Sequence, residues 1–333
     1  MSIIYIRGFE DKNVDESASV WNGSIGVSNI PGGGWAARTE YGAGGDFRVY
    51  VSEMSEDDSP DFSTCYVRIY GKVFSAATDL DKIKWRVIDS NASPIVEVYA
   101  DGHVYISGVD KGDQGYTITD SWARLEFGIK VNSVSGHVIF KINGTTIYSI
   151  YTDLSAHPAV GSLGIADDTA FNSAWMDDIV INDTNGSRNN SWPGSGHVYG
   201  LKPNAAGSNA DLDAFPGTGE SNYQDVDEVP NDGDTTYVQS NADGDLDTYN
   251  FEALGSDLIV KGLAVHTITK LVSAGSTGLK TVAKSGANYS KKTTPTQSTS
   301  YSRRGAVYED APDGAAWTKA KVDAAEFGVE VVV

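Results

Sequence analysis

The strongest constraint on the fold is an alternation of apolar and polar residues with a period of two through most of the first half of the chain. The segment 82–89, for example, turns isoleucine, tryptophan and valine to one side and charged residues to the other. The dipeptides Asp101-Gly102 and Asn143-Gly144, which favour two-residue hairpin turns, separate further alternating runs. Because successive side chains of a strand point to opposite faces, this pattern predicts antiparallel sheets, each with one buried and one solvated face.

Composition then divides the chain into two domains. A length of 333 residues fits about two domains of roughly 150 residues each. A run rich in Gly, Ser, Asn and Pro follows the alternating half, and we place a linker at residues 189–199. Residues 1–188 are predicted to form a jelly-roll sandwich, and residues 200–333 a second, smaller β-sandwich. The predicted fold class is therefore all-β.

The second domain carries two local predictions. Residues 257–272 form an alternating apolar pattern that includes Ile259 and predicts a strand. Near the end of the chain, Thr318 is a suitable N-cap for one short helix over residues 319–326, and Gly328 suits the position just after it. A closing strand is expected after this helix.

Charge limits the partners that the chain can have. The net charge is −20 and the sequence pI is about 4.5, which disfavours nucleic acid and anionic membranes, because both attract basic surfaces. Divalent cations are the partners that this charge favours. The apolar stretch at the N-terminus is too short for a signal peptide, and no run of 18 apolar residues predicts a membrane span.

Three residues within predicted strands are expected to have structural roles. Asp177 and Asp178 are adjacent, so one of them must point inward, where we expect it to accept hydrogen bonds from loop backbone. Cys65 is the only cysteine, so no intramolecular disulfide can form. It lies in a strand pattern and is expected to be a small core residue.

Several segments together resemble a known family. The sequences RGFED (7–11), DSWARLEFGIKVNSVSGHVIFKINGTTI (120–147) and WMDDIVIND (175–183) resemble the concanavalin A-like, laminin G-type jelly roll found in many phage and prophage proteins. Residues 222–254 and 315–331 resemble a β-domain that often follows it in phage tail and other virion proteins.

This resemblance implies a structural component of a bacteriophage particle, such as a tail, fibre or surface protein. Its partners would be other virion proteins and further copies of itself. It would be located in the virion after assembly in the host bacterial cytoplasm, a setting that suits two β domains without disulfides. The function would be assembly, without enzymatic activity.

One acidic segment resembles a calcium loop. Oxygen-bearing side chains recur at alternate positions and again at the twelfth position: Asn241, Asp243, Asp245, Asp247 and Glu252. This spacing supplies the oxygen ligands that Ca²⁺ requires. However, Leu246 stands where such a loop needs glycine for its sharp turn. A structural Ca²⁺ held by Asp243, Asp245, Asp247 and Glu252 is the one cofactor hypothesis, and a solvated acidic turn is the alternative.

A lectin-like module is the main alternative function. The glycine-rich segment 31–47 is expected to form a loop at the rim of the sandwich. Trp35 and Tyr41 within it could stack on the face of a sugar, so a host-surface glycan is the corresponding partner. The competing interpretation is that Trp35 packs beneath the loop, because tryptophan is highly buried on average.

Enzymatic readings have less support in the sequence. A glycoside hydrolase needs two carboxylates across the scissile bond, and the acidic pairs of this chain do not fall in strands with suitable apolar and aromatic neighbours. No G-x-S-x-G motif is present. The segment 157–164 brings a histidine and a serine close in sequence, a pairing that is common by chance.

Overall fold

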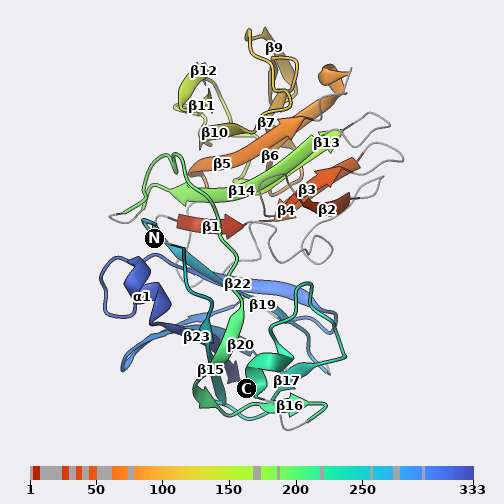
Figure 1. Ribbon diagram of the computed structural model, residues 1–333. Helices are drawn as coiled ribbons and strands as arrows, with labels where there is room; N and C mark the ends of the chain where they lie inside the picture. The colour runs from red at the N-terminus through yellow and green to blue at the C-terminus, as the bar shows by residue number, and fades with distance from the viewer. Residues whose placement is uncertain are drawn as a thin grey trace. The chain divides into compact units, whose positions relative to one another are not determined.

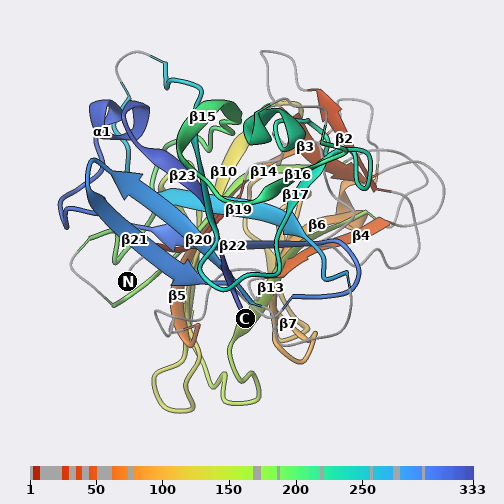
Figure 2. The same cartoon turned by 90° about the horizontal axis from the view of Figure 1, so that it is seen from below.

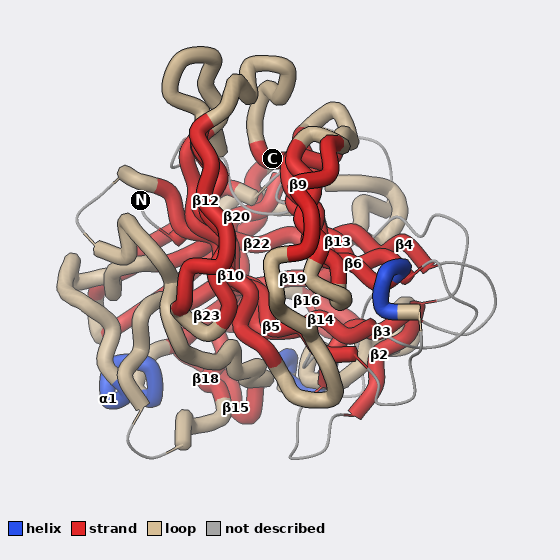
Figure 3. The backbone as a smooth tube through the Cα atoms, turned by 90° about the horizontal axis from the view of Figure 1, so that it is seen from above, coloured by secondary structure: helices blue, strands red, loops and turns tan. Residues whose placement is uncertain are grey.

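The computed structural model describes residues 3–7, 25–29, 35–39, 45–50, 62–73, 79–167, 174–185, 188–217, 221–255, 258–272, 278–294 and 297–333. These residues fall into two compact units, the first ending at Val198 and the second starting at Tyr199. Strands dominate both units, and the helical segments are short (Figure 3). No helix within the described residues is long and apolar enough to cross a membrane.

The first unit is built from two antiparallel sheets (Figure 1). Across the eight-stranded sheet lie β12 (Thr145–Tyr151), β11 (His137–Ile142), β10 (Ala123–Lys130), β5 (Thr64–Val73), β14 (Ala174–Asp183), β3 (Trp35–Thr39) and β2 (Ile25–Asn29), with β1 (Ile3–Arg7) paired to β14. Across the six-stranded sheet lie β4 (Gly45–Tyr50), β13 (Val160–Asp167), β6 (Ile83–Asp89), β7 (Pro94–Tyr99), β8 (His103–Ile106) and β9 (Val109–Asp113). The 3-10 turn η2 (Leu80–Lys82) leads into β6.

A tryptophan ties the two sheets together. Trp85 of β6 is fully buried, and its indole N–H donates to the carbonyl of Trp175 on β14 at 3.1 Å. Its ring lies so close to Gly71 of β5 that a Cβ there would be 2.7 Å from the indole. Buried residues at alternate positions, including Cys65 with no exposed surface, complete the core. The predicted all-β sandwich is therefore confirmed, and Cys65 is a core residue as expected.

A segment that composition marks as a linker lies on the outer face of the eight-stranded sheet. We call residues 188–198 the strap. Its Trp192 contacts the ring of Tyr66, with centroids 5.1 Å apart, and a Cβ at Gly128 would be 2.9 Å from the indole. Lys141 places its ammonium 3.5 Å from the centroid of the same indole ring. An indole in these contacts gains both apolar burial and a cation–π attraction.

Asp178 closes the strap onto β14. One carboxylate oxygen accepts from the N–H of Val198 at 2.6 Å, and the other lies 2.8 Å from Nδ1 of His197. Arg68 beneath it donates to the carbonyl of Asp178 at 3.1 Å and to that of Gly194 at 3.3 Å. Asp178 adopts a φ of 52°, a left-handed conformation that Asp and Asn tolerate better than most residues. The prediction that one of the paired aspartates accepts from loop backbone is thus confirmed, but its predicted inward direction was wrong, because Asp178 meets the strap on the outer face of the sheet.

The second unit contains a five-stranded sheet and two strand pairs (Figure 2). The five-stranded sheet has the order β15 (Pro203–Ala210), β18 (Leu246–Phe251), β23 (Glu326–Val332), β20 (Gly278–Ser285) and β21 (Asn288–Thr293). The pairs are β16 (Asp213–Phe215) with β17 (Tyr237–Gln239), and β19 (Leu263–Thr269) with β22 (Ser302–Tyr308). The helical segments are η3 (Asn222–Asp225) and α1 (Lys319–Asp323).

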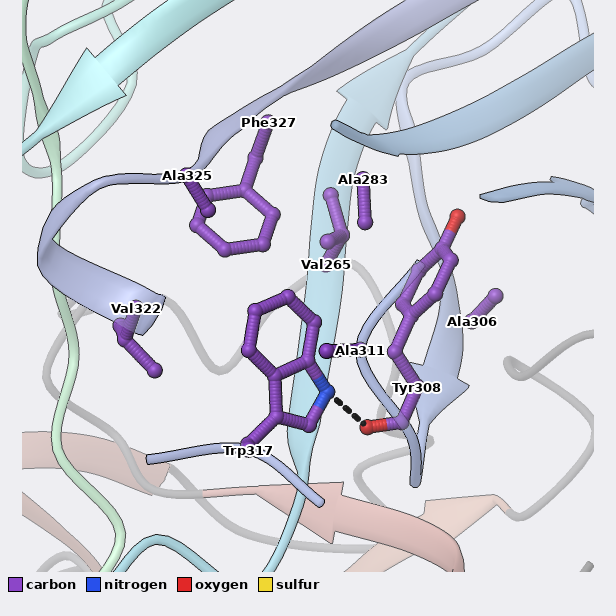
Figure 4. Close-up of a cluster of buried hydrophobic side chains, with 9 residues drawn as sticks. All are labelled: Val265, Ala283, Ala306, Tyr308, Ala311, Trp317, Val322, Ala325 and Phe327. Carbon is purple, nitrogen blue, oxygen red and sulfur yellow. Dashed lines mark hydrogen bonds between the residues drawn. The ribbon is translucent and has the colours of Figure 1, made fainter. Parts of the chain in front are cut away.

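The core of the second unit lies between β19, β22, β20, β23 and α1 (Figure 4). Its centre is Trp317, whose indole N–H donates to the carbonyl of Tyr308 at 3.0 Å and whose ring is 5.9 Å from that of Phe327. Val265 and Val322 pack against this group from β19 and α1. The pair β19–β22 thus packs across the larger sheet, which gives the predicted second sandwich.

Two local predictions for this unit were wrong in their bounds. The helix begins after Thr318, whose hydroxyl accepts from Lys321 N–H at 3.3 Å as predicted, but it ends at Asp323. Gly328 lies in β23 and does not cap the helix. Glycine is required there because β18 passes so close that a Cβ would be 1.9 Å from the carbonyl oxygen of Asp247. The strand predicted over 257–272 is shorter, and Ile259 is 90% exposed.

We predict that Asp178→Ala loosens the strap. The substitution removes both acceptors and leaves a strained φ, which should cost about 2 kcal/mol and speed amide exchange within residues 191–198 roughly 30-fold. Asp178→Asn should have a smaller effect, because Asn keeps an acceptor and tolerates the same backbone conformation. Hydrogen exchange followed by mass spectrometry measures this, and unchanged exchange in both variants would show that Asp178 does not hold the strap.

Candidate functional site

The outer face of the six-stranded sheet gathers polar and aromatic side chains. Successive side chains of its strands point alternately to the core and to this outer face, where Arg86 and Glu97 are themselves buried while Lys84, Tyr99 and Tyr105 are partly exposed. Register places Lys84 of β6 opposite Tyr99 of β7. It also places Glu97 of β7 between Arg86 of β6 and Tyr105 of β8. Side chains from three neighbouring strands thus meet on one surface.

Two tyrosine rings lie side by side on this surface. The centroids of Tyr99 and Tyr105 are 5.0 Å apart, and the rings are tilted by 45°. Both residues are half-buried, so part of each remains open to solvent. Partial burial raises the pKa of Tyr105, and nearby Asp110 acts in the same direction. The phenol therefore stays protonated and able to donate a hydrogen bond across the physiological range.

An ion pair borders the tyrosines. The ammonium of Lys84 lies 3.5 Å from a carboxylate oxygen of Glu97 and donates to the hydroxyl of Tyr99 at 3.1 Å. The side chains of Lys84 and Glu97 are only 15% and 11% exposed. Their attraction is therefore screened less by water than that of a surface pair. This contact fixes the orientation of Tyr99 and leaves charged groups at the edge of the aromatic surface.

A histidine and an aspartate extend the site towards β9. Nδ1 of His103 lies 3.3 Å from a carboxylate oxygen of Asp110, with side chains 37% and 44% exposed. The hydrogen bond to Asp110 raises the pKa of His103. The N–H of Gly112 donates to Asp110 at 2.8 Å, and this contact lowers the pKa of Asp110. We call Lys84, Glu97, Tyr99, His103 and Tyr105 together the tyrosine face.

The tyrosine face has the chemistry needed to bind a sugar ring. One side of a pyranose presents C–H groups that can lie against an aromatic ring, while its hydroxyls accept and donate hydrogen bonds at the edge. Two tyrosines supply the aromatic surface, and a lysine, a glutamate and a histidine supply donors and acceptors beside it. A small number of convergent polar groups beside an apolar surface is typical of binding sites. By contrast, the strap already occupies the outer face of the other sheet over Gly128.

The rim loop predicted over residues 31–47 is in part strand, because β3 (Trp35–Thr39) lies within it and β4 begins at Gly45. Trp35 is the first residue of β3, which lies in the eight-stranded sheet, while the tyrosine face lies on the six-stranded one. The side chain of Trp35 and the whole of Tyr41 lie outside the described residues. Glycan binding by Trp35 and Tyr41 therefore stays a prediction.

The predicted calcium ligands engage separate partners. Asp247 is fully buried in β18 and accepts from the N–H of Leu212 at 2.9 Å, the amide of Asn222 at 2.7 Å and the hydroxyl of Tyr249 at 2.9 Å. Burial and the neighbouring carboxylate raise the pKa of Tyr249. Asp247 therefore serves as a structural acceptor that joins β18 to the chain around η3.

The other three carboxylates also bind within the protein. Asp243 accepts from the N–H of Val333 at 3.1 Å, Asp245 accepts from the hydroxyl of Ser240, and Glu252 accepts from backbone at the start of β15. Across the part of the chain that the structure describes, no three or more His, Cys, Asp or Glu residues are grouped so that they could hold a metal ion. Calcium binding by this segment stays a prediction that the geometry does not support.

We predict that Asp247→Ala destabilises the second unit by about 3 kcal/mol, because two buried donors and one partly buried donor lose their acceptor. Asp213→Ala, at an exposed position of β16, should change stability by less than about 0.5 kcal/mol. Scanning calorimetry with and without calcium measures both effects. A melting temperature of the native chain that rises with calcium, and no longer does so in Asp247→Ala, would restore the calcium hypothesis.

The pair His103–Asp110 gives a prediction for titration. His103 should titrate above a peptide histidine, and Asp110→Asn should return its pKa towards about 6.5. Because the folded-state pKa of His103 is raised, its contribution to stability is complete below the unfolded pKa and is lost as pH rises through the folded value. NMR of the imidazole protons measures this, and an unshifted His103 in the native chain would mean that the pair does not form in solution.

Comparison with known proteins finds similar solved structures but no family. No protein-family model matches the sequence, and no curated protein matches it. Similar solved structures include domain 4 of an extracellular arabinanase from Geobacillus stearothermophilus in complex with arabinotriose, at 14% identity and a TM-score of 0.40, covering 54% of this chain and 92% of that one. An endo-β-1,4-glucuronan lyase from Trichoderma reesei has 10% identity and a TM-score of 0.37, covering 54% and 90%.

A xylan-binding domain from Paenibacillus barcinonensis has 13% identity and a TM-score of 0.30, covering 54% of this chain and 93% of that one. Identities and TM-scores of this size describe a likeness of fold and carry no argument about function. The chain thus shares a likeness of fold with domains of an arabinanase, a glucuronan lyase and a xylan-binding protein.

Proposed function

We propose that the protein binds a glycan on the tyrosine face. The observation that carries this proposal is the pair of half-buried rings, Tyr99 and Tyr105, with centroids 5.0 Å apart and charged hydrogen-bonding groups at their edge. A sugar ring stacks on one tyrosine, and its hydroxyls bond to Lys84, Glu97 and the tyrosine hydroxyls. The proposed ligand class, a glycan, is also that of the xylan-binding domain and of the arabinotriose complex named above, although the proposal does not depend on them.

The balance of charge on this surface favours an uncharged glycan. Lys84 and Arg86 lie on the same face as Glu97 and Asp110, and Asp113 stands opposite His103, so this face carries no excess of positive charge when His103 is neutral. The chain as a whole carries a charge of −20, which repels acidic polysaccharides at long range. A neutral sugar polymer is therefore the expected ligand class.

The virion assignment from the sequence resemblance stays a separate prediction. None of the solved structures named above is a phage protein. Glycan binding and assembly can coexist in one protein, so a test of the first leaves the second open.

Replacing one tyrosine tests the proposed function. Tyr105→Ala should weaken binding to a neutral polysaccharide about tenfold, because loss of a stacked ring costs about 1–2 kcal/mol. Tyr151→Ala is the matched control, since Tyr151 is 74% exposed on β12 of the other sheet. Affinity electrophoresis against a panel of neutral and acidic polysaccharides, followed by calorimetric titration of the best ligand, measures the effect.

The outcomes separate the two predicted locations. Loss of binding in Tyr105→Ala with binding retained in Tyr151→Ala and Trp35→Ala supports the tyrosine face. Loss only in Trp35→Ala moves the site to the predicted rim. Failure of the native chain to bind any polysaccharide of the panel contradicts glycan binding altogether.

A further inference from the structure

A serine, a histidine and an aspartate form a hydrogen-bonded chain at one end of the six-stranded sheet. Oγ of Ser107 lies 2.9 Å from Nε2 of His157, and Nδ1 of the same ring lies 2.8 Å from Oδ2 of Asp89. The partners are separated by 50 and 68 positions in the sequence. Both distances fall in the range that nucleophile, base and orienting carboxylate require, and each ring nitrogen faces the correct partner.

Hydrogen bonds from backbone N–H groups hold the aspartate in place. Asp89 is buried at the end of β6, and its other oxygen, Oδ1, accepts from the N–H groups of Asn91 at 2.9 Å and Ser93 at 2.7 Å. Gly161 lets the chain after His157 approach this turn, because a Cβ there would be 2.6 Å from Ser90. The carboxylate thus holds the imidazole with its Nδ1 protonated, which leaves Nε2 free to act as a base towards the serine.

The serine occupies an exposed and strained position. Ser107 starts the turn between β8 and β9 with a φ of 50°, where glycine, asparagine or aspartate is preferred. Its residue is exposed, whereas His157 is only 6% exposed. A Cβ placed on the next residue, Gly108, would meet no atom within 4 Å, so the turn beside the hydroxyl is open. A nucleophile raised on a strained turn beside a buried base is an arrangement suited to acyl transfer.

We propose that Ser107, His157 and Asp89 form a hydrolytic triad for short-chain carboxylic esters. Oγ bonds to the acyl carbon while His157 Nε2 takes its proton, and the carbonyl electrons move onto the oxygen. The intermediate collapses and breaks the bond to the alcohol, which takes the proton from His157. Water then attacks the acyl-serine with His157 again as base, and this step releases the acid and restores the Ser107 hydroxyl.

The developing oxyanion needs a hydrogen-bond donor, and backbone N–H groups next to the nucleophile can supply one. The N–H of Ser107 itself donates to the carbonyl of Ile95 at 3.0 Å, so this role falls to the amide of Gly108. The open surroundings of the turn admit an ester carried on a larger molecule, with acetyl esters as the simplest case. This inference uses none of the five side chains of the tyrosine face and does not rest on glycan binding.

A second Ser–His contact provides an internal control. Oγ of Ser149 lies 3.0 Å from Nε2 of His137, which reproduces the first contact of the proposed triad. Among the described residues, no carboxylate is hydrogen-bonded to His137, and its ring stacks on Tyr151 with centroids 3.9 Å apart. Burial lowers the pKa of His137. Ser149 should therefore react far more slowly than Ser107 if the aspartate is what activates the pair.

The test is covalent labelling of the full chain with diisopropyl fluorophosphate, mapped by peptide mass spectrometry, alongside hydrolysis of p-nitrophenyl acetate. We expect one adduct, on Ser107, formed with loss of fluoride, and ester turnover that Ser107→Gly abolishes. Glycine suits the left-handed turn, so this variant should fold. Asp89→Asn should slow both reactions at least about 100-fold, because it favours the wrong imidazole tautomer.

Three results would overturn the inference: no adduct on Ser107 in the folded chain, labelling of Ser107 no faster than that of Ser149, or ester turnover that survives in Ser107→Gly. In each case the network would be a structural link between β6, the β8–β9 turn and the segment before β13. Circular dichroism of each variant confirms that a loss of reactivity is not a loss of fold.

Discussion

The packing of Trp85 between the two sheets of the first unit is the contact on which its surfaces depend. The indole fills the space left by Gly71 on β5 and donates to the carbonyl of Trp175 on β14, so one side chain joins three strands of two sheets. Full burial of a large aromatic ring is among the most favourable single contributions to a core. With the inner faces fixed in this way, the alternate residues of every strand are forced outward, and they form the outer surfaces described above.

The outer faces of the two sheets differ in which side chains remain open to solvent. On the eight-stranded sheet, the strap covers the centre through Trp192 and is held by Asp178. On the six-stranded sheet, Tyr99 and Tyr105 remain half-buried beside the pair Lys84–Glu97. An aromatic surface with ordered donors and acceptors, partly open to solvent, is suited to reversible binding of a polar ligand. This contrast between the sheets is the physical basis of the proposed function.

The sequence predicted the features that depend on short-range patterns of residues. Period-two alternation predicted the strands, and Asn143-Gly144 predicted a hairpin turn in which both residues adopt positive φ, 52° and 87°. The alternation around Trp85 predicted its burial, and the adjacent aspartates predicted an acceptor for loop backbone. Each of these depends on residues near one another in the chain or on the two faces of a single strand.

What the sequence could not predict depends on register and long-range approach. Alternation turns Tyr99 outward, but only the pairing of β6, β7 and β8 brings Lys84 and Tyr105 beside it. The strap has the composition of a linker, and what orders it is contact with distant residues such as Asp178, which bonds to His197 and to the N–H of Val198. In the same way, His157 lies near Ser162 in the sequence, whereas the structure joins it to Ser107, 50 positions away.

The most direct test of glycan binding on the six-stranded sheet is a map of the ligand's footprint. NMR chemical-shift changes would be recorded for the full chain on addition of a neutral oligosaccharide taken from the best-bound polysaccharide. The account predicts that the largest changes fall on Lys84, Glu97, Tyr99, His103 and Tyr105, with small changes on β12 and in the second unit. Changes that concentrate elsewhere, or saturating ligand that leaves these five residues unmoved, would contradict it.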